Sequence, residues 1–104
     1  MKTHSITLGM NIPDAGTVTN QMWIDFLNVT VLASLEYATI TDSIGIYKGT
    51  LEKSKTISVT TEDPAAVDAL RKVGDAYKQA FNQDAIMYTA VSYPHLPLPT
   101  IYSV

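Results

Sequence analysis

Residues 63–82 read DPAAVDALRKVGDAYKQAFN and form the most complete helical signal of the chain. Asp63 is a good N-cap, and Pro64 stands at the first helical position, where its missing N–H costs nothing. Gly74 costs about 1 kcal/mol relative to alanine inside a helix, so it indicates a close contact with a neighbouring element. Asn82 is the expected C-cap. The inward stripe at helical spacing consists of Val67, Leu70, Val73, Tyr77, Ala80 and Phe81.

Segments in which apolar and polar side chains alternate lie on both sides of this helix and predict β-strands. Residues 5–10 (SITLGM) and 55–61 (KTISVTT) each have one apolar face, which is typical of half-buried strands. Residues 84–92 (DAIMYTAVS) carry apolar groups on both faces and predict a strand that is covered on both sides.

The longest strand-like segment spans residues 37–48, YATITDSIGIYK. Asp42 interrupts its apolar face. Gly45 predicts a bulge, which would change the phase of the residues that follow it. Residues 49–54 are then expected to form the hairpin connection to the next strand.

A second helix is predicted over residues 20–31, with Thr19 as its N-cap. The order β-α-β-β-α-β predicts an α+β, ferredoxin-like fold, a four-stranded antiparallel sheet with two helices on one face. Residues 1–93 would form this single domain, and residues 94–104 a proline-rich C-terminal tail. The other face of the sheet would carry hydroxyl side chains, from Thr7, Thr39, Thr41, Tyr47, Thr56, Ser58 and Thr60.

The composition narrows the classes of function. The chain has 104 residues, a net charge of −3 and no basic run, so a nucleic-acid partner is not expected. The absence of cysteine excludes disulfides and thiol chemistry. Without a leader or an apolar run of about 20 residues, we expect a cytoplasmic protein that does not span a membrane. Only 16% of residues are charged and six are tyrosine, which favours a homo-oligomer formed through the sheet face or an edge strand.

Asp42 is the most informative acid, because it lies on the apolar side of a strand. It is either a buried carboxylate in a pocket or a side chain that the bulge at Gly45 or a neighbouring Lys55 accommodates. Ser54 and Lys55 are adjacent on a strand and point to opposite faces, so they are a poor nucleophile–base pair. The candidate binding residues are Asp42, Tyr47, Thr39, Thr41, Tyr88 and Lys55.

Tyr47 and Tyr88 are expected to line the open face of the sheet. His4 and His95 stand at the two ends of the chain without a cluster of carboxylates, so neither a metal site nor a cofactor is expected.

Several pieces of the chain occur in the same order in one known family: Leu8–Met10, Pro13, Gly16, Trp23, Phe26, Thr39, Asp42, Gly45 and the segments 52–55 and 76–83. Over about residues 6–89 the chain therefore resembles that family, the small bacterial domain of unknown function DUF3574. The resemblance places Tyr47 where relatives usually carry tryptophan. It implies a ferredoxin-like fold, and it carries no established catalytic residues.

Two functions follow from these observations. The first is a non-enzymatic binding or assembly module, such as a phage or bacterial protein that binds a host factor, because no catalytic set has workable spacing. The alternative is a small-molecule enzyme of the dimeric α+β barrel type, in which two such sheets enclose a cavity. Asp42, Tyr47 and His4 would be its polar groups. Convergence of these side chains on one pocket would favour the enzyme.

Overall fold

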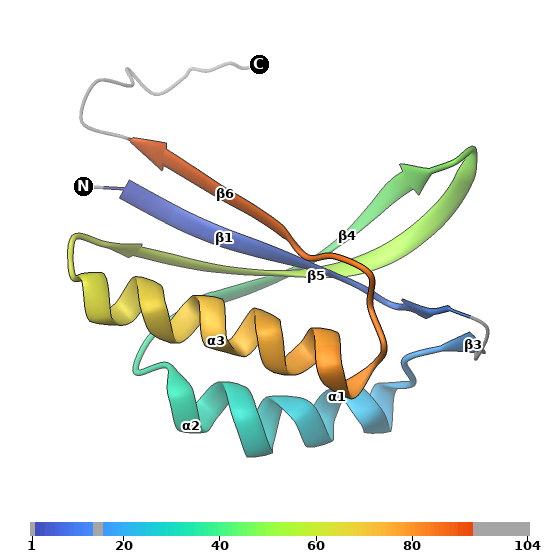
Figure 1. Cartoon of the computed structure of the whole chain (residues 1–104), viewed down its shortest axis with the longest axis horizontal. Helices are drawn as coiled ribbons and strands as arrows, with labels where there is room; N and C mark the ends of the chain where they lie inside the picture. The colour runs from blue at the N-terminus through green and yellow to red at the C-terminus, as the bar shows by residue number, and fades with distance from the viewer. Residues whose placement is uncertain (1, 14–15, 93–104) are drawn as a thin grey trace.

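The computed structural model describes residues 2–13 and 16–92, so the predicted proline-rich tail lies outside the described residues. It confirms the α+β, ferredoxin-like fold: a four-stranded antiparallel sheet in the order β4-β5-β1-β6, with helices on one face (Figure 1). The strands are β1 (Lys2–Gly9), β4 (Thr39–Tyr47), β5 (Thr50–Thr61) and β6 (Met87–Ser92), and β2 (Asn11–Ile12) and β3 (Gly16–Thr17) form a short second sheet. The helical elements are α1 (Asn20–Phe26), the π-helical η1 (Leu27–Val31), α2 (Leu32–Ser34) and α3 (Pro64–Ala80).

Local signals account for the ends of α3 and the start of α1. The side chain of Thr19 accepts from the backbone N–H of Met22 at 3.2 Å, and Asp63 caps α3 with Pro64 in the first turn. Both predicted N-caps are therefore confirmed. The C-cap of α3 is Phe81, one residue earlier than predicted. Asn82 follows it with a φ of 52°, a left-handed conformation that asparagine tolerates after a helix end.

The first helix ends later than the sequence indicates, and it contains a π turn. The N–H of Leu32 donates to the carbonyl of Leu27, five residues back. Phe26 and Val31 are both buried, although their spacing would turn them apart on a regular α-helix. The helix thus continues through α2 to Ser34 instead of ending at residue 31.

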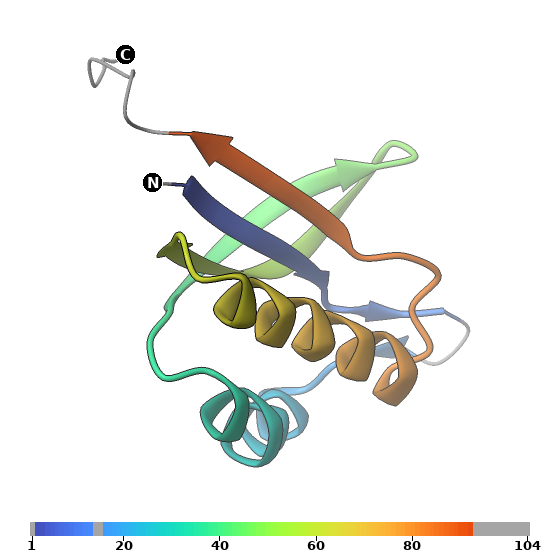
Figure 2. The same ribbon diagram turned by 60° about the vertical axis from the view of Figure 1, so that its left-hand side comes forward.

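The core lies between the sheet and the helices, which cover the same face (Figure 2). Aromatic rings join the two helices: Phe26 meets Tyr77 edge-on with 5.3 Å between ring centroids. The fully or nearly fully buried members are Ile6, Leu8, Ile57 and Val59 from the sheet, Leu70, Val73 and Tyr77 from α3, and Trp23, Phe26 and Val31 from the first helix.

The β4–β5 hairpin is longer and more regular than predicted. Its register runs unbroken from Thr39 opposite Ser58 to Tyr47 opposite Thr50, so the bulge expected at Gly45 is absent from the described hairpin. The turn consists of Lys48 and Gly49, with φ values of 51° and 75°, as the tightest hairpin turns require. Residues 50–54, predicted as a connection, are therefore strand. The arm extends beyond the helices (Figure 1).

Strand β6 is shorter than predicted and is covered on one side only. It begins at Met87, and the side chains of Met87 and Val91 are 64% and 42% exposed. The loop before it is held by the side-chain amide of Gln83, which donates to the carbonyl of Asn11 at 2.7 Å. The expectation of a strand covered on both faces is wrong for the single chain, because the helices lie on one side of the sheet.

Candidate functional site

The candidate site is a groove of about 710 Å³ between the β4–β5 hairpin and the segment that leads into α1. Met10, Val18, Ile44 and Leu51 supply apolar walls. Charged and amide side chains share the same lining: Asp42, Lys53, Lys55, Asn11 and Asn20. This mixture of apolar walls and a few polar groups is typical of sites for small molecules.

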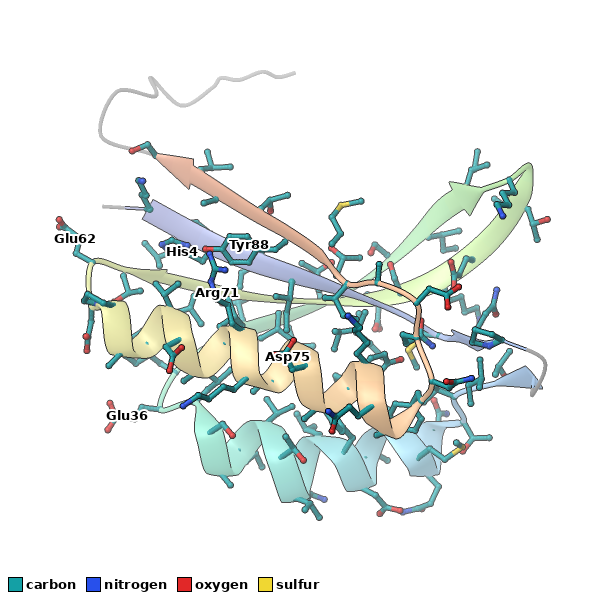
Figure 3. All side chains as sticks on the ribbon, in the orientation of Figure 1. His4, Glu36, Glu62, Arg71, Asp75 and Tyr88 are labelled. Atoms are coloured by element: carbon teal, nitrogen blue, oxygen red, sulfur yellow. The ribbon has the colours of Figure 1, made fainter. Side chains whose placement is uncertain are left out.

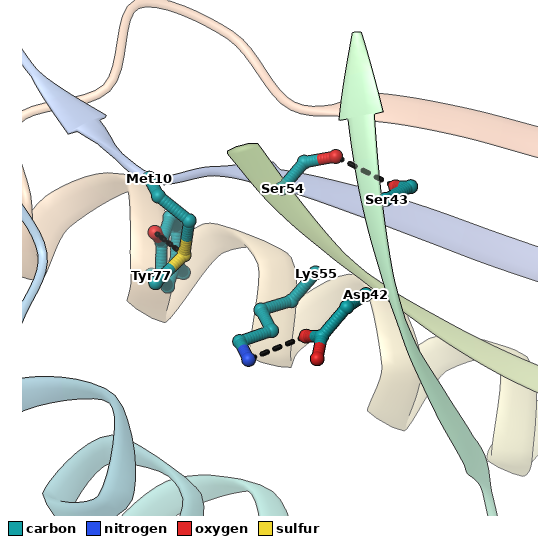
Figure 4. A network of polar contacts seen from close by, with 6 residues as sticks. All are labelled: Met10, Asp42, Ser43, Ser54, Lys55 and Tyr77. Atoms are coloured by element: carbon teal, nitrogen blue, oxygen red, sulfur yellow. Dashed lines mark hydrogen bonds and ion pairs between the residues drawn. The ribbon is translucent and has the colours of Figure 1, made fainter. Parts of the chain in front are cut away.

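Asp42 and Lys55 face each other across the strands and form the charged centre of the groove. Lys55 Nζ lies 2.5 Å from Asp42 Oδ1, because the two residues are register partners (Figure 4). The side chain of Lys55 is only 20% exposed, whereas that of Asp42 is 78% exposed. The Lys55 ammonium also lies 5.5 Å from the centre of the Trp23 ring. The alternative in which Lys55 accommodates Asp42 is therefore the observed one.

Ser54 lies on the other side of the sheet from its neighbour Lys55. Its hydroxyl is 2.8 Å from that of Ser43, and Figure 4 shows this contact and the Asp42–Lys55 pair on different sides of the strands. The prediction that Ser54 and Lys55 point to opposite faces is confirmed. A serine–lysine catalytic pair has no geometric basis here.

One rim of the groove is anchored by Tyr77 of α3. Its hydroxyl donates to the carbonyl of Gly9 at 2.5 Å and lies 3.6 Å from the sulfur of Met10. Burial raises the pKa of Tyr77 well above its usual value of 10, and the negative charge of Glu52 raises it further. The hydroxyl therefore stays protonated, as this donation requires.

Glu52 secures the same rim from the hairpin. Its carboxylate accepts from the backbone N–H of Asn11 at 3.3 Å, and Met10 donates its N–H to the carbonyl of Lys53 at 2.9 Å. The sequence pattern does not indicate these roles of Tyr77 and Glu52. A stripe position for Tyr77 carries no signal that its hydroxyl reaches the end of β1.

Tyr88 and His4 lie elsewhere, and His4 lines a separate hollow of about 510 Å³ beside the start of α3. His4 Nδ1 is 2.5 Å from the Tyr88 hydroxyl, and the Arg71 guanidinium lies 4.3 Å from the centre of the Tyr88 ring (Figure 3). Tyr88 is the register partner of Ile6, so it belongs to the helix side of the sheet. Its predicted place on the open face is wrong.

The remaining predicted site residues do not join Asp42 either. Thr39 and Thr41 alternate with Asp42 along β4 and thus point to the opposite face. The side chain of Tyr47 lies outside the described part of the chain. Of the six candidates, the structure brings together Asp42 and Lys55.

Within residues 2–13 and 16–92, no three histidine, aspartate or glutamate side chains gather in a way that suits a metal ion. Over the same residues, no helix is both long and apolar enough to cross a membrane.

Two solved structures share the fold with a TM-score of 0.62 each. They are a phage SAM lyase in complex with S-methyl-5′-thioadenosine, 18% identical to this chain, and a phage SAM lyase in its apo state, 20% identical. Each match covers 86% of this chain and 78% of the other. No curated protein matches the chain.

Both similar structures are of an enzyme. This finding contradicts the sequence-based prediction of a non-enzymatic binding or assembly module that engages a host factor. It favours the alternative of an enzyme that acts on a small molecule.

The resemblance that the sequence showed is also confirmed at the level of the family. The model of a family described as "protein of unknown function (DUF3574)" matches residues 3–93. This range includes every strand and helix of the sheet and helix layers except Lys2 at the start of β1. The chain belongs to the DUF3574 family.

Proposed function

We propose that this protein is a lyase that cleaves S-adenosylmethionine, or a closely related sulfonium compound, and releases S-methyl-5′-thioadenosine. The observation that carries the proposal is the similarity, over 86% of the chain, to a phage SAM lyase in complex with that thioether. The groove around Asp42 and Lys55 is the proposed site.

The reaction balances without a second reactant. The bond from the sulfonium sulfur to Cγ of the methionine part breaks, and its electron pair stays on sulfur as a neutral thioether. The bond that Cγ loses is replaced by a new bond formed within the substrate. Either its own carboxylate attacks Cγ and closes a lactone, or a base removes a proton from Cβ and an alkene forms. The protein must therefore orient the substrate, and in the second route it must accept a proton.

The groove has a size and a polarity that suit this substrate. Its volume of about 710 Å³ falls within the roughly 300–1,000 Å³ of typical small-molecule sites. The apolar walls formed by Met10, Val18, Ile44 and Leu51 suit the adenine ring and the thioether of the product.

The acidic and basic side chains of the groove suit different charged groups of the substrate. Asp42 is exposed and negative, so it suits the sulfonium or the ammonium group. Lys53 and Lys55 line the same groove and suit the substrate carboxylate. We assign Asp42 to stabilising the sulfonium and, in the alkene route, to accepting the proton, and Lys53 to binding the carboxylate.

The test is direct incubation of the whole chain with S-adenosylmethionine, followed by mass spectrometry. We expect S-methyl-5′-thioadenosine to form in proportion to protein concentration. The accompanying four-carbon product, a lactone or an unsaturated amino acid, identifies the route. The proposal fails if thioether formation does not exceed spontaneous decay and calorimetry detects no binding of either compound.

Two variants separate the function from the assigned residue. Asp42→Asn removes the charge with little change in shape, and we expect it to lose thioether formation. Asp75→Asn is the matched control, because Asp75 is exposed on α3 and is absent from the groove lining. Full activity in Asp42→Asn would remove Asp42 from the mechanism while leaving the proposed reaction standing.

A further inference from the structure

The sheet face opposite the helices has the composition of an interface. We call it the open face, and its side chains come from all four strands. Strand alternation and the register place these residues on it: Thr3, Ser5, Thr7, Thr39, Thr41, Ser43, Ser54, Thr56, Ser58, Thr60, Met87, Thr89 and Val91. None of them is charged, and Glu52 stands only at the hairpin end of the face, where it bonds to Asn11.

Most hydroxyls of the open face are already paired with one another. Cross-strand contacts join Thr3 to Thr60 at 2.7 Å and Ser5 to Ser58 at 2.8 Å, and Ser43 to Ser54 at 2.8 Å. Covering a polar group is costly mainly when it is left without a partner. Because these hydroxyls bond across the strands, the face loses little when water is removed from it.

We propose that the open face binds the open face of a second copy of this chain. The chain carries a net charge of −3, so two copies repel each other where charged surfaces meet. The open face avoids this repulsion, since its uncharged hydroxyls serve as both donors and acceptors. Such a surface is self-complementary, as a two-fold interface requires. Met87 and Val91 add exposed apolar area along β6.

The area of the open face determines how strongly we expect two chains to associate. Four strands about 4.8 Å apart, over about seven residues of 3.3 Å each, give roughly 450 Å² in projection. Side-chain relief raises the accessible area above that figure, towards the approximately 800 Å² per partner of standard stable interfaces. We therefore expect an association that depends on protein concentration.

This inference does not rest on the proposed reaction. The charged side chains Asp42, Lys53 and Lys55 of the groove lie on the helix side of the sheet, where Lys55 contacts Trp23. Ser43 and Ser54 of the open face also line the groove, but pairing of the open faces leaves the Asp42–Lys55 pair uncovered. Failure of the lyase assay and failure of the association are thus separate results.

The first measurement is sedimentation equilibrium of the whole chain over a range of concentrations. We expect the mass to rise from 11.4 kDa to at least twice that value. Thr41→Glu and Met87→Glu place charges on the open face and should hold the mass at 11.4 kDa. Val29→Glu is the control, since Val29 is 75% exposed in the helix layer, and it should associate as the wild type does.

Two further variants test whether the chains associate through the hairpin arm or through residues 93–104 instead of the open face. Leu51→Glu alters the exposed hairpin arm, and a chain that stops at Ser92 removes residues 93–104. The proposal is overturned if the wild type is a monomer throughout. It is equally overturned if either of these variants abolishes association while Thr41→Glu and Met87→Glu do not.

A labelling experiment decides the question if the charged variants fail to fold. The chain has no cysteine, so single replacements Thr41→Cys and Val29→Cys give unique sites for a maleimide. We expect the labelling rate at position 41 to fall as protein concentration rises, while the rate at position 29 stays constant. Equal behaviour at both positions would overturn the proposal.

Discussion

Replacing Tyr77 by phenylalanine tests how α3 is tied to the end of β1. The Tyr77 side chain is fully buried, and its hydroxyl donates to the carbonyl of Gly9 at 2.5 Å. Phenylalanine keeps the ring contacts and removes the donor. Loss of a buried hydrogen bond that leaves its acceptor unpaired costs about 1–2 kcal/mol. For a domain of this size, each kcal/mol lowers the melting temperature by roughly 4–8 °C.

A comparison of the stability of the wild type and the variant at two pH values tests the same hydrogen bond further. Tyrosine has a pKa of about 10 in the unfolded chain, and burial raises the pKa of Tyr77 above that value in the folded protein. Above pH 10 the unfolded state loses a proton that the folded state retains, so stability falls as pH rises. The loss is about 1.4 kcal/mol at pH 11. Tyr77→Phe does not show this loss of stability, and all other titrating groups are the same in the two proteins.

The assay is urea unfolding of both proteins, followed by the fluorescence of the single tryptophan, Trp23. At pH 8 the wild type should be more stable by about 1–2 kcal/mol. At pH 11 the two free energies of unfolding should nearly coincide. A gap that stays constant between these two pH values would refute the argument that burial holds the hydroxyl in its protonated form.

Three further substitutions follow from the same structure. Gly74→Ala should stabilise the protein by about 0.4–1 kcal/mol, because the added methyl would meet Ile86 at an ordinary contact distance of 3.6 Å; a lower urea midpoint would contradict this. Thr61→Val should cost about 1–3 kcal/mol, since the buried hydroxyl accepts from the N–H of Asp63 at 3.0 Å; thermal melts that match the wild type would count against it. Asp42→Asn should cost no more than about 1 kcal/mol of stability, as is usual for exposed ion pairs, so its loss of thioether formation should occur in a folded protein, which circular dichroism can verify.

Features that depend on a few neighbouring residues could be predicted from the sequence. The caps at Thr19 and Asp63 follow from local hydrogen bonding, and the apolar stripe of α3 follows from helical period. The Asp42–Lys55 contact was also among the alternatives, because a carboxylate on an apolar strand face needs a partner. The caps and the stripe use spacing that the chain itself fixes, whereas the Asp42–Lys55 contact also needed the register between β4 and β5.

Features that depend on register could not be predicted in the same way. Gly45 has the composition of a bulge, but pairing along the whole hairpin holds it in a regular strand. Strand β5 begins at Thr50, earlier than predicted, because the two-residue turn at Lys48 and Gly49 leaves no residues for a longer connection. The predicted face of Tyr88 is wrong because this strand has apolar side chains on both faces, so alternation alone does not tell which face meets the helices.

The π turn of η1 also determines where the length of this chain is free to change. Phe26 and Val31 are buried five positions apart, and Asn28 between them is exposed. Deleting Asn28 would bring the separation to four, which an ordinary α-helix places on one face. The helix would then run on as a regular α-helix with every buried side chain still facing the core. A shorter relative that lacks one residue here would keep the same architecture, so alignments within the family should allow a gap between Phe26 and Val31.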